Sequence, residues 1–181
     1  MHRIARAPAS SANLGPGFDT LAVALGLYVE VELEDRAQGL LVEPKGEGSE
    51  LPTGASHLAA QVACKILGHD RVTLRVRSEI PVARGLGSSA ALAVAAAAAA
   101  GVEEGTEGAF RCGAACDGHA ENAAASSFGG LVAAALVNDR PVARPLPLDP
   151  LLGFVVLVPE HRLSTAAARD LLPGAVPFDD A

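Results

Sequence analysis

A long stretch without a charged side chain, residues 85–102, constrains this sequence more than any other feature. It consists mostly of alanine, glycine and serine, and Arg84 and Glu103 bracket it. A membrane-spanning helix needs about 20 mostly strongly apolar residues, and this stretch is built of small, weakly apolar ones. Alanine has the highest intrinsic helix propensity. We therefore predict a buried helix of a soluble domain over residues 89–100.

The overall composition supports a folded core built from small side chains. Alanine supplies 37 of the 181 residues, whereas aromatic residues make up only 3%. Such a core packs through Ala, Val and Leu, and its apolar content excludes a disordered chain. The length allows one full domain and the start of a second. The net charge of −7 argues against a general nucleic-acid or anionic-membrane binder.

The cysteines and the first residues of the sequence indicate the cellular compartment of the protein. Cys64, Cys112 and Cys116 form no even disulfide framework, and the last two lack the second Cys/His pair that a zinc site needs. The first residues do not have the pattern of a secretory signal peptide. We therefore expect a reduced, cytoplasmic protein.

Periodicity predicts a mixture of strands and helices. Apolar and charged residues alternate over residues 29–34 and 71–77, which predicts two strands with one solvent-exposed face each. Helical spacing, alanine content and stop signals predict four helices, at residues 56–67, 89–100, 107–116 and 164–172. Apolar runs predict buried strands at residues 131–137 and 151–158, and the prolines of residues 141–150 predict a linker between them. This order indicates an α+β fold with one domain over residues 1–150 and the start of another over residues 151–181.

The sharpest motif is PVARGLGSSAA, residues 81–91, where a glycine-rich turn opens into the alanine-rich helix. Glycines let the backbone approach an anion closely, and the free N–H groups at a helix N-terminus suit a phosphate. Ser88 and Ser89 offer hydroxyls to a phosphate or a metal ion. The motif is neither a Walker A loop, which needs a lysine, nor a Rossmann fingerprint, which needs a third glycine. An ordinary glycine turn with a serine N-cap is the alternative interpretation.

Two further motifs bring acidic and amide side chains together. PASSANLGPGFD, residues 8–19, carries Asn13 and Asp19, which Asx turns also explain without any function. DGHAEN, residues 117–122, carries two carboxylates four residues apart, which share a face if the segment is helical. A cation such as Mg²⁺ between them would relieve their repulsion. Two solvated acids on an exposed turn are the alternative.

A fourth motif, LSTAAARD, begins the last predicted helix at residues 163–170. Ser164 or Thr165 fits a helix N-cap. Arg169, one turn later, suits bidentate binding of a carboxylate, and a surface helix residue is the plainer interpretation.

Together and in this order, the four motifs resemble those of the GHMP small-molecule kinases, and within them the homoserine kinase family. The resemblance rests on residues 8–19, on GLGSSA at 85–90, on GHxxN at 118–122 with its trailing Gly-Gly, and on STAxAR at 164–169. It extends from residue 3 to about residue 173. It implies an N-terminal α+β domain with a left-handed βαβ crossover, similar to a ribosomal-protein domain, followed by the start of a ferredoxin-like C-terminal domain.

The resemblance also implies a function. It is the ATP-dependent phosphorylation of the side-chain hydroxyl of L-homoserine to O-phospho-L-homoserine, in threonine biosynthesis. The alternatives are a GHMP kinase for a different small alcohol and a non-catalytic nucleotide-binding fragment. A small-molecule substrate is the expected partner, without nucleic acid or membrane, and an exposed apolar strand would favour a homodimer.

Site residues follow from the resemblance by position. Those that would bind ATP are Pro81, Arg84, Gly85, Leu86, Gly87, Ser88, Ser89 and Ala90. Mg²⁺ would be held by Ser88 or Ser89 together with Asp117. The residues that would bind homoserine are Asn13, Asp19, His119, Asn122 and Arg169, the last at the substrate carboxylate. The catalytic candidates are Asn122 and Glu121, and no dedicated strong base is assigned.

Two departures from the family pattern matter. Asp117 and Glu121 stand where the family has Glu and Asp, so each carboxyl group moves by about one methylene. Displacements of ~1 Å can lower a rate by ~10²-fold. The family's glycine-rich Gly-x-Gly-Pro motif near the triphosphate is also missing, which predicts a chain that lacks most of the C-terminal domain.

Overall fold

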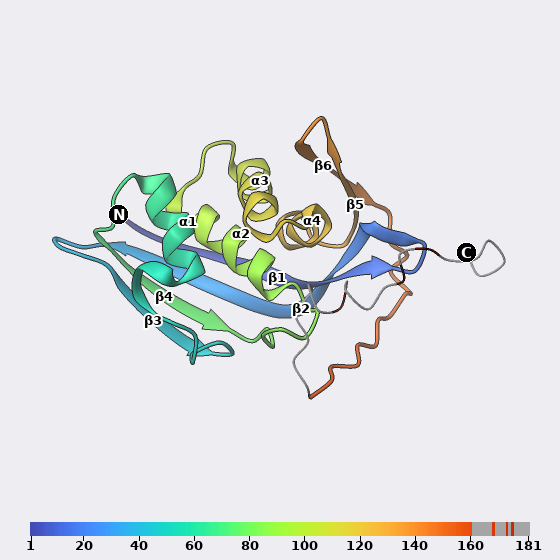
Figure 1. Ribbon diagram of the computed structural model, residues 1–181, viewed down its shortest axis with the longest axis horizontal. Helices are drawn as coiled ribbons and strands as arrows, with labels where there is room; N and C mark the ends of the chain where they lie inside the picture. The colour runs from blue at the N-terminus through green and yellow to red at the C-terminus, as the bar shows by residue number, and fades with distance from the viewer. Residues whose placement is uncertain (161–167, 169–172, 174, 176–181) are drawn as a thin grey trace.

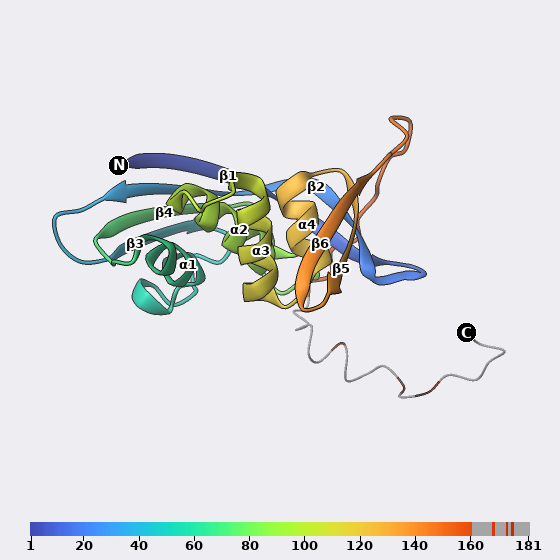
Figure 2. The same cartoon turned by 90° about the horizontal axis from the view of Figure 1, so that it is seen from above.

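The computed structural model describes residues 1–160 together with residues 168, 173 and 175. This part forms one six-stranded sheet with its helices packed on one face (Figures 1 and 2). The strands are β1 (His2–Leu14), β2 (Gly17–Asp35), β3 (Leu41–Gly46), β4 (Val72–Ser78), β5 (Leu131–Val137) and β6 (Arg140–Leu146). The helices are α1 (Leu58–Leu67), α2 (Ser88–Ala100), α3 (Gly105–Asp117) and α4 (Ala120–Phe128), preceded by a 3₁₀ turn, η1 (Gly54–Ser56). The expected α+β class is confirmed.

The long hairpin of β1 and β2 organises the sheet. β1 pairs antiparallel with β2 along nearly its whole length. On its other edge, β2 pairs with β4 over its C-terminal half and with β5 near its N-terminal end. The order is therefore β3-β4-β2-β5-β6, with β1 beside β2. β3 and β4 are parallel and are connected through α1, as a βαβ unit requires.

The strand alternation predicted from the sequence is confirmed. Val29, Val31 and Leu33 of β2 are buried against the helices. The intervening glutamates face away from the helices and pair with arginines of β4. Arg75 Nη1 lies 3.0 Å from a carboxylate oxygen of Glu32, in a pair that remains partly exposed. Such pairs contribute little stability, so the sheet depends mainly on its apolar face.

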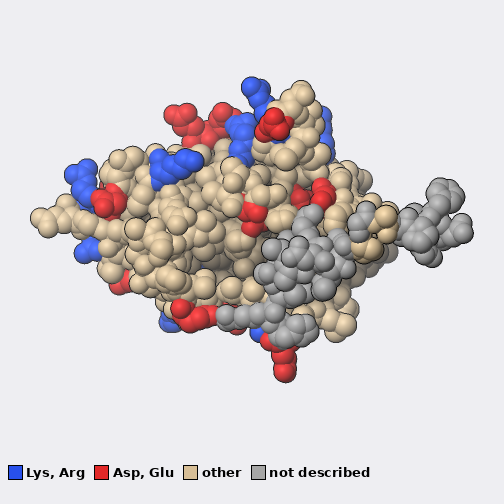
Figure 3. All heavy atoms as spheres, in the orientation of Figure 1, with Lys and Arg blue, Asp and Glu red and all other residues tan. Residues whose placement is uncertain are grey.

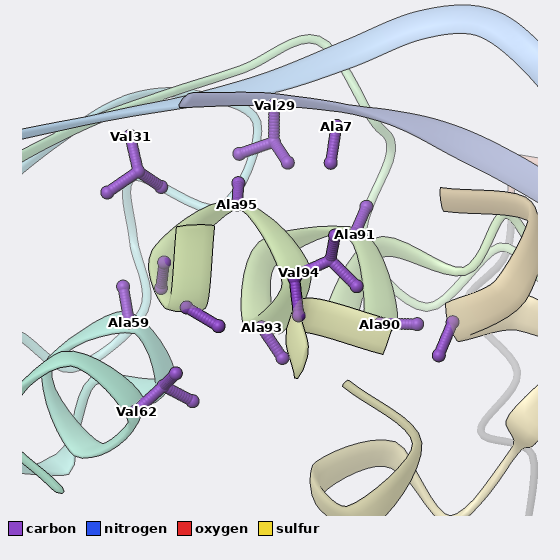
Figure 4. Close-up of a cluster of buried hydrophobic side chains, with 14 of the residues drawn as sticks. Ala7, Val29, Val31, Ala59, Val62, Ala90, Ala91, Ala93, Val94 and Ala95 are labelled. Carbon is purple, nitrogen blue, oxygen red and sulfur yellow. The ribbon is translucent and has the colours of Figure 1, made fainter. Parts of the chain in front are cut away.

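Helix α2 lies in the middle of the helical layer, between the sheet, α1 and α3 (Figure 4). It is buried on nearly all sides, which is why its sequence shows no polar face. Small side chains permit close approach: a Cβ added to Gly113 of α3 would lie 2.6 Å from a methyl of Val94. At its C-terminus, Arg3 of β1 donates a hydrogen bond to the Ala100 carbonyl at 3.1 Å. Within the described residues, no helix is both long and apolar enough to cross a membrane.

Two predictions for the C-terminal part were wrong. The proline-rich segment is partly a strand, since β6 includes Pro141 and Pro145. β6 ends the order of strands, and an edge strand tolerates residues without an N–H group because one side of it needs no partner.

Residues 151–158 do not form the predicted strand, and Leu151, Val155 and Leu157 are each at least 90% exposed. No described strand pairs with this segment, and a strand requires a partner for its backbone hydrogen bonds. The helix predicted over residues 164–172 lies outside the described residues, apart from residue 168.

Candidate active site

The loop between β4 and α2 has the backbone of an anion-binding site. Positive φ angles occur at every second residue, with 57° at Ala83, 73° at Gly85 and 62° at Gly87. Such alternation turns successive N–H groups toward a common point. Gly87 is the N-cap of α2, and no described side chain caps this helix. The alternative interpretation, a serine N-cap, is therefore wrong: the first-turn N–H groups have no side-chain cap.

Position 87 has no room for a side chain, because residues of two other motifs lie directly against Gly87. A Cβ at this position would lie 2.1 Å from Ser10 Oγ and 3.0 Å from Asn122 Oδ1. The loop is also attached to β1, because the Ser10 N–H donates to the Leu86 carbonyl at 3.1 Å. The glycine-rich loop thus lies directly against residues from the first and third motifs.

Asp117 also lies at the N-terminus of α2, where it contacts Ser89. It is the last residue of α3, and its carboxylate accepts a hydrogen bond from the Ser89 hydroxyl. His119 Nδ1 lies 2.9 Å from the Asp117 carbonyl oxygen and 3.4 Å from a carboxylate oxygen. The carboxylate therefore faces the first turn of α2, where the helix dipole favours negative charge.

Asp117 and Glu121 do not share a helix face, contrary to the sequence-based hypothesis. Gly118, with φ 75°, ends α3, and α4 begins at Ala120 in a new direction. Glu121 is only 3% exposed, and its Oε1 has no hydrogen-bond partner among the described residues. The two carboxylates are also not solvated acids of one exposed turn.

Asn13 has a structural role in the connection between β1 and β2. It lies near the end of β1 with φ 58°, and its Oδ1 accepts a hydrogen bond of 2.8 Å from the Asp19 N–H. This bond closes the turn between β1 and β2. An Asx turn joins the side chain to the N–H two residues on, and this bond reaches six residues on, so the Asx-turn interpretation of Asn13 is not confirmed. A binding role for its side chain stays a prediction.

These segments enclose a cavity of about 530 Å³ at the N-terminus of α2. The predicted site residues that line it are Asn13, Arg84, Gly85, Leu86, Gly87, Ser88, Ser89, Asp117, His119 and Asn122. The predicted residues that do not line it are Pro81, Ala90, Asp19 and Glu121. Arg169 lies outside the described residues. Three of the four sequence motifs therefore meet at one place, and Ala168, the one described residue of the fourth motif, also lines the cavity.

A second, mostly apolar cavity of about 260 Å³ adjoins the first and shares Val82, Ser88 and Ser89 with it. The sequence did not predict this cavity, because its lining residues are scattered over β2, β3, β4, α1, α2 and the connections between them and form no single motif. His57 is its buried polar residue: Nδ1 accepts from the Ala59 N–H at 3.3 Å and caps α1. Burial lowers the pKa of His57.

Charged side chains are unevenly distributed over the face of the molecule seen in Figure 3. In the view of Figure 3, they lie mostly toward the rim, and the central surface is largely uncharged. Arg84, at the glycine-rich loop, is the cationic side chain that lines the larger cavity, and it donates a hydrogen bond to the Pro159 carbonyl. An anion bound at the loop would therefore meet backbone N–H groups and a single described guanidinium.

Residues 55–130, which extend from just before α1 to the end of α4, match the family of GHMP kinases N-terminal domains. Over this segment, which is less than half of the chain, the sequence is similar to the N-terminal domains of GHMP kinases.

Curated proteins that are similar to this chain include homoserine kinases. The chain is 43% identical to the homoserine kinase of Thermus thermophilus and 42% identical to that of Rhodococcus erythropolis, over 96% and 98% of its length. The crystal structure of a homoserine kinase from Cytophaga hutchinsonii has the same fold, with a TM-score of 0.77 at 24% identity over 98% of this chain. The chain spans 61% and 63% of the two curated relatives and 62% of the crystallised one.

Proposed function

We propose that this chain binds Mg·ATP and transfers the γ-phosphoryl group to the side-chain hydroxyl of L-homoserine, a step of threonine biosynthesis. The carrying observation is that three separate motifs converge on one cavity at the uncapped N-terminus of α2. The names of the relatives, homoserine kinases at about 40% identity, support the choice of acceptor.

The glycine-rich loop is the proposed triphosphate site. The alternating positive φ angles at Ala83, Gly85 and Gly87 direct N–H groups inward, and the dipole of α2 adds positive potential at the same point. Arg84 adds a charge-assisted donor. Phosphoryl transfer depends mainly on positioning and on neutralising charge, which these groups supply.

Mg²⁺ is the proposed metal, held by Ser88 or Ser89 and Asp117. The hydrogen bond between the Ser89 hydroxyl and the Asp117 carboxylate supports this assignment, because it brings two oxygen ligands together at the phosphate loop. Mg²⁺ prefers oxygen ligands and commonly takes one or two carboxylates plus substrate phosphates. When bound, it would neutralise charge on the transferring phosphoryl group.

The smaller apolar cavity is the proposed nucleobase site. It adjoins the loop through Val82, Ser88 and Ser89, so a nucleotide with its phosphates at the loop can direct its base into it. Ligand sites of this kind are mostly apolar with a few polar groups. His57 is the buried polar group on the α1 side of the cavity.

The acceptor is proposed to bind on the side of the loop that faces His119 and Asn122. These residues and Asn13 line the larger cavity, and Asp19 and Arg169 are proposed for the ammonium and carboxylate groups of the amino acid. The acceptor oxygen forms a bond to the γ-phosphorus as the bond from that phosphorus to the β,γ-bridging oxygen breaks. ADP leaves with the electron pair of the broken bond, and the hydroxyl proton passes to solvent water. Asn122, which lines the larger cavity, and Glu121, which does not, stay the catalytic candidates.

We also propose that residues 1–150 form the ATP-binding domain and that residues 151–181 begin a second domain. The exposed apolar side chains of residues 151–158 support this division, because a neighbouring domain or a second copy would cover them. Cytoplasmic location and small molecules as partners belong to the same proposal.

The test is ADP release from Mg·ATP by this chain with L-homoserine, with mevalonate or with no acceptor. Homoserine-dependent release is the expected result. Release that requires mevalonate would favour a GHMP kinase for another alcohol. Binding of Mg·ATP without release in any arm would favour a non-catalytic nucleotide-binding fragment.

A further inference from the structure

Ser10 is a fully buried polar residue that connects two motifs of the cavity. Its exposed fraction is 0%, although it carries a hydroxyl. Its N–H donates to the Leu86 carbonyl at 3.1 Å, and its Oγ donates to Asn122 Oδ1 at 2.9 Å. β1 therefore reaches both the glycine-rich loop and α4 through one side chain and its own backbone.

The hydroxyl bond determines which end of the Asn122 amide faces the cavity. An asparagine side chain has one acceptor oxygen and an NH₂ group with two donors. Because the Ser10 hydroxyl donates to the Asn122 oxygen, the NH₂ group of Asn122 is the end of the amide that faces the cavity. In a reversed amide the NH₂ group would donate to Ser10 Oγ, but the buried hydroxyl proton would lose the Asn122 oxygen as its acceptor. A buried donor left without an acceptor costs about 1–3 kcal/mol, which favours the observed orientation.

We infer that Ser10 is a positioning residue that holds the Asn122 amide with its NH₂ donors toward the transferring phosphoryl group and the acceptor hydroxyl. The choice of those two targets rests on the proposed function. The orientation of the amide does not, because it follows from contacts within the protein.

The chain offers a matched control for a merely structural role. Ser126 lies one turn after Asn122 on α4, and its hydroxyl donates to the Pro8 carbonyl of β1 at 2.9 Å. It is 3% exposed, so it joins the same helix to the same strand in a comparably buried place. Ser126→Ala removes such a bond without touching the Asn122 amide.

The experiment compares Ser10→Ala, Ser10→Cys and Ser126→Ala in the full chain. Alanine leaves the space of the hydroxyl empty, whereas cysteine fills it with a larger sulfur that donates poorly, so an effect shared by both variants comes from the lost hydrogen bond rather than from a change in volume. The side-chain NH₂ resonances of Asn122 are assigned by their loss in Asn122→Asp, and their shifts and heteronuclear relaxation are measured in each variant. We expect shifted and more mobile NH₂ signals in both Ser10 variants and unchanged signals in Ser126→Ala.

Turnover supplies the second readout. Homoserine-dependent kcat is expected to fall ~10- to 100-fold in the Ser10 variants with little change in KM, and to stay within about 2-fold in Ser126→Ala. Asn122 signals and kcat that are the same in the Ser10 variants and in Ser126→Ala would overturn the inference. If the wild-type chain shows no homoserine-dependent turnover, the proposed function fails, and the NH₂ resonances alone still decide the role of Ser10.

Discussion

At the scale of single residues, comparing alanine substitutions at Gly85 and Gly87 distinguishes the cost of backbone strain from the cost of a steric clash. Both have positive φ, so alanine at either position costs about 1–2 kcal/mol of stability. Only at Gly87 would the new Cβ also meet Ser10 Oγ, at 2.1 Å, whereas nothing described lies within 4 Å of one at Gly85. Chemical denaturation is therefore expected to show a larger loss for Gly87→Ala than for Gly85→Ala. Equal losses would contradict the packing of Ser10 against the loop.

His57 makes stability depend on pH. Burial lowers its pKa from the usual 6.5, so between 6.5 and the lower folded value the unfolded chain binds more protons. Its contribution is fully present above pH 6.5 and is lost as the pH falls below that value. His57→Asn keeps an N-cap acceptor for α1 but does not titrate.

Urea denaturation of both proteins at pH 5, 6 and 7 measures this effect. The wild type is expected to lose more stability on acidification than His57→Asn. Parallel losses would show that His57 is not held neutral by its burial.

The cavity residues that could be predicted from the sequence are those that belong to a short local motif. The glycine spacing before α2 identified Gly85, Gly87, Ser88 and Ser89, which line it. Glu121 was predicted beside Asp117 because a four-residue spacing assumes a continuous helix. The positive φ of Gly118 ends that helix, and no periodicity reveals such a break.

At the scale of elements, α2 tests how tightly an alanine core is packed. Ala96 is fully buried, and Ala98 on the same helix is exposed. Leucine resembles alanine in helix propensity, so both substitutions change mainly packing. Ala96→Leu is expected to cost about 1–3 kcal/mol through overpacking, and Ala98→Leu about 0.5 kcal/mol or less. Thermal or chemical unfolding checks this, and an equally small effect at both positions would contradict a close-packed helical layer.

Helices and strands with a clear apolar periodicity could be predicted from the sequence. Elements whose formation depends on pairing or packing with other segments could not. β5 matches its predicted bounds, and the predicted helix at residues 89–100 is α2 within one residue. β1 and α4 were not predicted, because their small and polar residues carry motifs rather than a clear period. The strand expected at residues 151–158 lacks a described partner, which an apolar run alone does not reveal.

At the scale of the whole molecule, the sheet has a helix-covered face and a face of paired charges. Arg75 and Arg77 pair with glutamates of β2 on that second face, so it has no need of a cover. The apolar residues 151–158 differ, since contiguous exposed apolar surface indicates an interaction site. The relatives are longer than this chain, which spans 61% of one of them. This exposure supports the proposal that a second domain begins near residue 151.

The central claim is that three separated motifs form one site for Mg·ATP. The most direct measurement is a titration of the ¹⁵N-labelled chain with Mg·ATP, followed through its backbone amide resonances. We predict the largest shifts in residues 83–90 and 117–122, with smaller ones around Val82 and His57 at the apolar cavity. Absence of shifts at saturating nucleotide, or shifts centred on the charged face around Arg75 and Arg77, would contradict the account.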